Sequence, residues 1–72
     1  MNKQELIDLG EQLRGIGHRR RELAERVFAE AADGDTADSK QLYQELASVT
    51  DQAITLMKRQ KDILESEVRK LH

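Results

Sequence analysis

The feature that most constrains this chain is a row of residues from Leu6 to Val27 whose spacing alternates between three and four. This alternation is the a/d pattern of a heptad repeat, which places apolar side chains in one stripe along an α-helix. We call this stripe the seam. Its members in the N-terminal half are Leu6, Leu9, Leu13, Ile16, Arg20, Leu23 and Val27. The pattern predicts a long helix that packs lengthwise against a second helix.

A second seam follows in the C-terminal half, formed by Leu42, Leu46, Val49, Ala53, Leu56, Gln60 and Ile63. Arg20 and Gln60 are the polar members of the two seams. We interpret them as residues that set the register between the helices, as a polar residue at an a position does in a coiled coil. For Arg20 an alternative stays open, namely a partly buried cation that awaits a carboxylate of a partner.

The one turn signal of the sequence, Asp33-Gly34-Asp35-Thr36, separates the two halves. Gly34 suits the left-handed residue that closes a helix, and Asp35, Thr36 or Asp38 can cap the next one. At the start of the chain, Asn2 and Glu5 have the spacing of a capping box. We therefore predict one domain over residues 1–72, with a helix at about 3–32, a turn at 33–38 and a helix at about 39–71.

A turn this short forces the two helices to run antiparallel. The predicted fold class is all-α, an antiparallel two-helix hairpin of the coiled-coil type. Folding about the turn brings Leu9 level with Ile63 and Leu23 level with Val49. Beside the first seam, the small residues Gly10, Gly17, Ala24 and Ala31 recur every seven residues and allow another backbone to approach closely.

Two helices form one seam and enclose no core, so apolar residues remain outside it. Large exposed apolar patches are typical of interfaces. We therefore predict that two hairpins dimerise into a four-helix bundle. The predicted dimer interface consists of Ile7, Phe28, Ile54, Met57, Leu64 and Val68.

Composition narrows the function classes. The 72 residues include no Cys and no Pro, 36% are charged, and the formal net charge is −2. The absence of Cys excludes disulfides and thiolate metal sites. Asp33–Gln44 is not a calcium loop, because its sixth position is Asp38 rather than Gly. We expect no cofactor, no metal, no catalytic residues, no small-molecule substrate, no membrane contact and a cytoplasmic location.

The densest charge run is His18-Arg19-Arg20-Arg21. One interpretation is a site for an acidic partner, because Arg and Tyr are enriched among the residues that dominate protein interfaces. Its contact residues are then Arg14, Arg19, Arg21 and Tyr43. The alternative is a solvated face, with Glu22, Glu25 and Glu30 as counter-charges at helical spacing.

Over about a third of the chain, the first helix resembles the opening helix of the all-helical chorismate mutases. The matching residues are Leu9, Leu13, Ile16, Arg20, Leu23, Ala24 and Val27. This resemblance implies an enzyme in which Arg20 binds substrate. The lysine that follows in that family is missing, since Glu30 and Ala31 stand in its place.

The hairpin layout and the acidic turn resemble the Rop-type plasmid RNA-binding proteins, which dimerise into antiparallel bundles. This resemblance implies RNA binding by a basic stripe built from Arg14, Arg19 and Arg21. The net negative charge and the lack of stacking aromatic residues on that face argue against it. The function we predict is a non-enzymatic, homodimeric protein-binding module, an adaptor or inhibitor of the sort that phages and mobile elements use to regulate host proteins.

Overall fold

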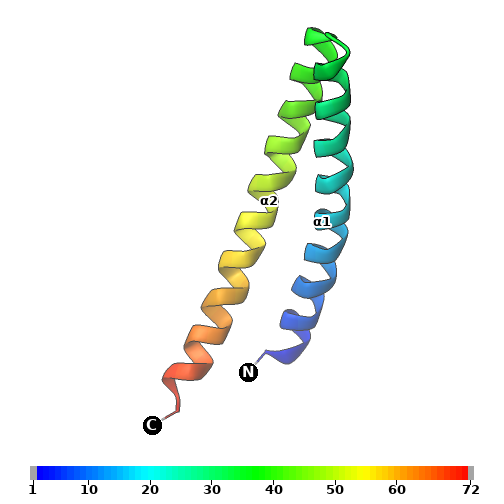
Figure 1. Cartoon of the computed structure of the whole chain (residues 1–72). Coiled ribbons are helices and arrows are strands. Elements are labelled where there is room, and N and C mark those ends of the chain that lie inside the picture. The colour runs from blue at the N-terminus through cyan, green and yellow to red at the C-terminus, as the bar shows by residue number, and fades with distance from the viewer. Residues whose placement is uncertain (1, 72) are drawn as a thin grey trace.

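The computed structural model describes residues 2–71 as two long α-helices, α1 (Lys3–Ala32) and α2 (Thr36–Arg69). Both terminal residues of the predicted 1–72 domain lie outside this description. The helices lie side by side from the turn to the termini, and both termini are at the same end (Figure 1). The predicted all-α, two-helix hairpin is therefore confirmed. It measures 57 × 16 × 13 Å, which is a rod with the thickness of one pair of helices.

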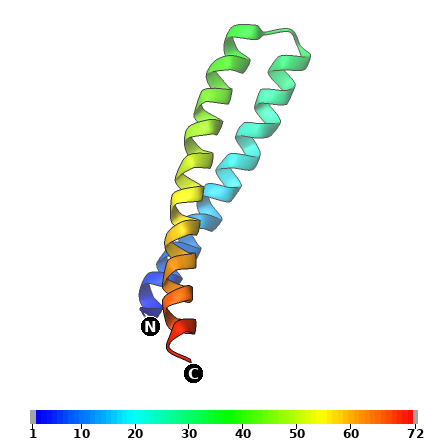
Figure 2. The same cartoon turned by 90° about the vertical axis from the view of Figure 1, so that its left-hand side faces the viewer.

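The two helices also twist about each other. In Figure 1 they are seen side by side near the termini, whereas in Figure 2, after a quarter turn, they overlap there and separate near the turn. A heptad repeat produces this twist, because 3.5 residues per turn keeps the seam facing the partner helix only if both helices coil.

The side chains that cap the helices come from the predicted residues. The Asn2 side-chain oxygen accepts a hydrogen bond from the Glu5 backbone N–H at 3.1 Å, so Asn2 caps α1. At the other end, Gly34 has a positive φ of 79°. This conformation lets the Asp35 N–H reach the Glu30 carbonyl at 3.0 Å and satisfies the last carbonyls of α1.

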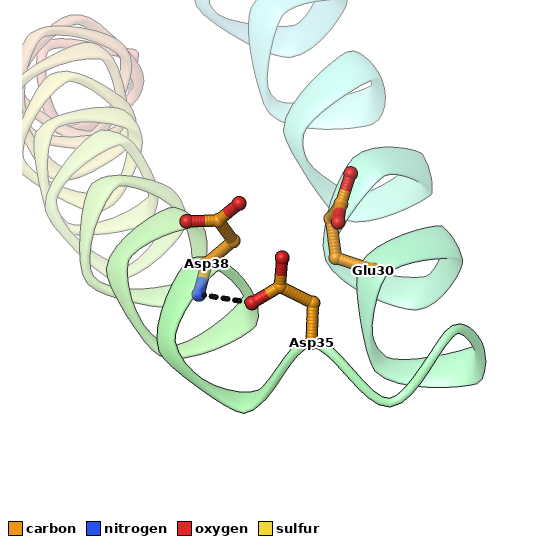
Figure 3. A group of neighbouring side chains, drawn as sticks. All are labelled: Glu30, Asp35 and Asp38. Atoms are coloured by element: carbon orange, nitrogen blue, oxygen red, sulfur yellow. Dashed lines mark hydrogen bonds between the residues drawn. The ribbon is translucent and has the colours of Figure 1, made fainter.

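The start of α2 differs from the prediction. The helix begins at Thr36 rather than near residue 39, so the turn is shorter than 33–38. The reason is that Asp35 is the cap, since its carboxylate accepts the Asp38 N–H at 3.1 Å (Figure 3). At the C-terminal end α2 stops at Arg69, two residues before the expected 71. The sequence offered Asp35, Thr36 and Asp38 as caps of this helix, and the backbone conformation of the fold shows that Asp35 is the one.

The core is small and lies on the seam. Among the described residues, the buried hydrophobic side chains are Leu9, Leu23, Val49 and Ile63, which are the residues expected to lie level in pairs. The other apolar seam residues are half-buried, as is Gln60. Arg20 is the exception, because it is exposed despite its seam position. A two-helix seam has no enclosing layer, so a long Arg side chain can extend sideways and keep its guanidinium in water.

Candidate functional site

The two flanks of the seam differ in chemistry. One flank is closed by ion pairs between the helices. Arg59 donates to the Glu5 carboxylate through Nε at 2.6 Å and Nη2 at 3.0 Å. Further along, Arg19 Nη2 donates to Glu45 Oε1 at 3.2 Å. We call this side the paired flank. Its ion pairs join the same heptad position of two antiparallel helices, which is where such pairs form in coiled coils.

The Glu5–Arg59 pair alters the acid–base properties of both groups. The hydrogen bond from Arg59 is the main cause that lowers the pKa of Glu5; desolvation opposes it, and the charge of Arg59 adds a smaller lowering effect. The same hydrogen bond raises the pKa of Arg59. Both groups are therefore held in their charged forms, and the pair ties the first turn of α1 to α2.

Among residues 2–71, the opposite flank has no such ion pair and carries most of the apolar residues left outside the seam. We call it the open face. On α1 it consists of Ile7, Gly10, Arg14, Gly17, Arg21, Ala24, Phe28 and Ala31. On α2 it consists of Lys40, Tyr43, Ala47, Thr50, Ile54, Met57, Lys61, Leu64 and Val68. These residues occupy heptad positions e and b of each helix, which lie next to one another on the same side of the seam. In an antiparallel pair, the e and b positions of both helices face one side of the hairpin.

The described surface is hollowed at both ends of the open face. Near the turn, Val27 and Ala31 of α1 line a groove of about 410 Å³ together with Lys40 and Tyr43 of α2. Near the termini a groove of about 720 Å³ is lined by Met57, Gln60, Lys61, Leu64, Glu65, Val68 and Arg69. The first groove contains residues from both helices, which places the two halves of the open face on the same side of the hairpin.

The predicted dimer-interface residues all lie on the open face and are exposed: Ile7, Phe28, Ile54, Met57, Leu64 and Val68. Phe28 is the most exposed, at 77% of its full surface, and Val68 follows at 64%. Nothing in the described chain lies within 4 Å of a Cβ built on Gly10 or Gly17. Within the described hairpin, the two glycines of the row of small residues therefore have no packing partner on this side.

The predicted partner-binding residues are divided between the flanks. Arg14, Arg21 and Tyr43 lie on the open face and are exposed, Tyr43 at 60%. Arg19 lies on the paired flank, where Glu45 holds its guanidinium. The structure thus places most of this predicted site on the same surface as the predicted dimer interface. The charge run alone cannot reveal this division, because neighbouring residues of a helix point in different directions.

Three carboxylates gather at the turn. Oxygens of Glu30, Asp35 and Asp38 all lie within 4.8 Å of one another (Figure 3). Hydrogen bonding to Asp35 and its negative charge raise the pKa of Asp38. The contact of Asp35 with the Asp38 backbone explains the arrangement as a helix cap that also suits the positive end of α2.

Among the described residues, sequence reasoning missed two ion pairs that join the helices, Glu5–Arg59 and Arg19–Glu45. Their signal was present, because Glu5 and Arg59, like Arg19 and Glu45, have opposite charges at equivalent heptad positions of antiparallel helices.

Within the described part of the chain, neither helix contains a stretch apolar and long enough to cross a bilayer.

The fold and the two flanks define a class, an antiparallel two-helix hairpin with one ion-paired flank and one open apolar face. No protein-family model matches this chain, and the searches of curated proteins and of solved structures give no match either. The resemblances to chorismate mutases and to Rop-type proteins therefore rest on the residues quoted above.

Proposed function

We propose that this hairpin is a non-enzymatic protein-binding module whose binding surface is the open face, and that a second copy of the chain covers this face to form a homodimeric four-helix bundle. The observation that carries the proposal is an apolar surface that runs the length of the hairpin on one side only. A surface of this kind is costly in water, since burial of each such side chain contributes roughly 1.5–3 kcal/mol.

A second copy is a suitable cover because its open face has the same length and the same mixture of large and small side chains. Met57, Leu64 and Val68 on α2 are large, whereas Gly10 and Gly17 on α1 leave space above the helix backbone. Packing α2 of one copy over α1 of the other joins large residues to small ones. A small adaptor or inhibitor that acts by protein–protein contact is the role we propose for such a module.

The experiment is sedimentation equilibrium with thermal unfolding over a thousandfold range of protein concentration. Coupled folding and association predicts a midpoint that rises with concentration. Leu64→Glu is the test variant, because Leu64 is exposed in the single hairpin and its replacement leaves the buried seam intact. We expect it to abolish the concentration dependence.

Ser48→Glu is the matched control, since it adds the same charge to α2 at an exposed position outside the open face. It should associate like the parent chain. A chain that stays monomeric and well folded at every concentration would refute the dimer. Loss of association in both variants would refute the open face as its site.

A further inference from the structure

The open face is cationic as well as apolar. Its charged members are Arg14 and Arg21 on α1 and Lys40 and Lys61 on α2, and the face includes no Asp or Glu. This contrasts with the chain as a whole, which has a net charge of −2. Carboxylates occur in the row beside it, Glu11 and Glu25 on α1 and Asp51 and Glu65 on α2, and Glu65 lines the groove near the termini.

Three of these four cations have no side-chain partner among the described residues. The side chains of Arg14, Arg21 and Lys40 make no hydrogen bond or ion pair with any residue in the described range 2–71. Lys61 reaches Glu65 at 3.5 Å, but the same carboxylate also accepts from Arg69. On the paired flank, by contrast, both Arg19 and Arg59 contact carboxylates across the helices. Within the described residues, most of the positive charge of the open face therefore has no carboxylate in contact with it.

The shape of the open face suits a helix. The two grooves lie at opposite ends of α2, around Tyr43 and Leu64. This separation corresponds to about 30 Å of helix, or five to six turns. Between them, the small residues of α1 leave room for a third backbone, since a Cβ on Gly10 or Gly17 meets nothing within 4 Å.

We infer that an acidic amphipathic helix of a partner protein, with apolar residues along one side and carboxylates at both edges, displaces the second copy from the open face. This inference rests on the proposed function, because it uses the same face. The argument is charge complementarity: carboxylates beside the apolar stripe would meet the unpaired cations, whereas a second copy brings another set of cations to the same surface. Like charges at an interface disfavour a partner, and opposite charges favour it.

The probe is a fluorescein-labelled peptide of three heptads, with Leu at a and d and Glu at the flanking e and g positions. Its counterpart has Lys in place of every Glu. Fluorescence anisotropy against the full chain should give a dissociation constant at least tenfold lower for the Glu peptide. Binding of the Glu peptide should weaken several-fold between low and high salt, because the contacts at the edge are solvent-exposed.

Arg21→Glu and Arg26→Glu form a matched pair of variants. Both residues are exposed positions of α1, but Arg21 lies on the open face and Arg26 lines a groove on the paired flank with Glu45. Circular dichroism confirms that each variant stays helical. We expect Arg21→Glu to weaken binding of the Glu peptide about three- to fivefold and Arg26→Glu to change it less than twofold, given typical energies of single exposed charge pairs.

Three results would overturn the inference: equal affinity for both peptides, equal effects of the two variants, or binding to phosphatidylserine vesicles without binding to the Glu peptide. The outcome is separable from that of the dimer experiment. A chain that sediments as a dimer and ignores the Glu peptide refutes the inference and leaves the dimer standing. A chain that sediments as a monomer and binds the Glu peptide refutes the dimer and leaves binding of an acidic helix standing.

Discussion

The glycines of α1 provide the most direct test of the two-flank architecture. Gly10, Gly15 and Gly17 are exposed, and a Cβ built on each meets nothing within 4 Å. Glycine in the interior of an exposed helix costs about 1 kcal/mol relative to alanine, because it loses more backbone entropy on folding. Each Gly→Ala variant should therefore stabilise the single hairpin by about 0.5–1 kcal/mol, which for a domain of this size raises the melting temperature by roughly 4–8 °C per kcal/mol.

The assay is urea denaturation followed by circular dichroism, at the lowest protein concentration that gives a signal and again at high concentration. Gly15 is the internal control, because it belongs neither to the seam nor to the open face. Its substitution should give the same gain at both concentrations. For Gly10→Ala and Gly17→Ala, the gain should shrink at high concentration if a second copy packs on the open face. A loss of stability in Gly17→Ala at the lowest concentration would refute the reasoning, because it would mean that this backbone is already packed within the hairpin.

Three further predictions concern the fold. Leu23→Ala should lower the free energy of unfolding by about 2–5 kcal/mol and abolish most helicity, because Leu23 is only 4% exposed in a small core. Chemical denaturation measures this change, and a loss under about 1 kcal/mol would contradict the assignment of Leu23 to the core of the seam. Asp35→Ala should cost about 1 kcal/mol through loss of the α2 cap, whereas Asp35→Asn should cost much less; equal losses would rule out capping. Because Arg59 lowers the pKa of Glu5 below its usual 4.5, their pair should stabilise the fold above that pH and cease to do so as the pH falls through the lowered value. Glu5→Gln should remove this component from the pH profile of the urea midpoint, and an unchanged profile would show that the pair does not contribute.

Much of the fold could be predicted from local rules. The alternation of three and four specifies a heptad seam, and the turn at Gly34 requires that the helices pair with each other. The four buried residues were predictable because burial in a coiled coil follows the heptad position. Arg20 is an exception to this rule. It occupies a seam position but is exposed, because its long side chain extends so that the hydrated guanidinium stays in solvent.

The candidate site was less predictable. The charge run at residues 18–21 marks a basic segment, yet consecutive helical residues point about 100° apart. Arg19 and Arg21 therefore end on opposite flanks, one paired with Glu45 and the other unpaired on the open face. Which arginines remain free depends on the residues that the second helix brings to each flank.

The sequence by itself determined the element types, the seam and the cap of the first helix, because these depend on spacing and on contacts within a few residues. Only the tertiary structure decided which flank is closed and which is open. That difference arises from residues such as Glu5 and Arg59, far apart in the chain, whose charges meet only when two antiparallel helices coil about one another. Long-range ion pairs close one side of the hairpin, and the apolar and cationic residues of the other side stay exposed.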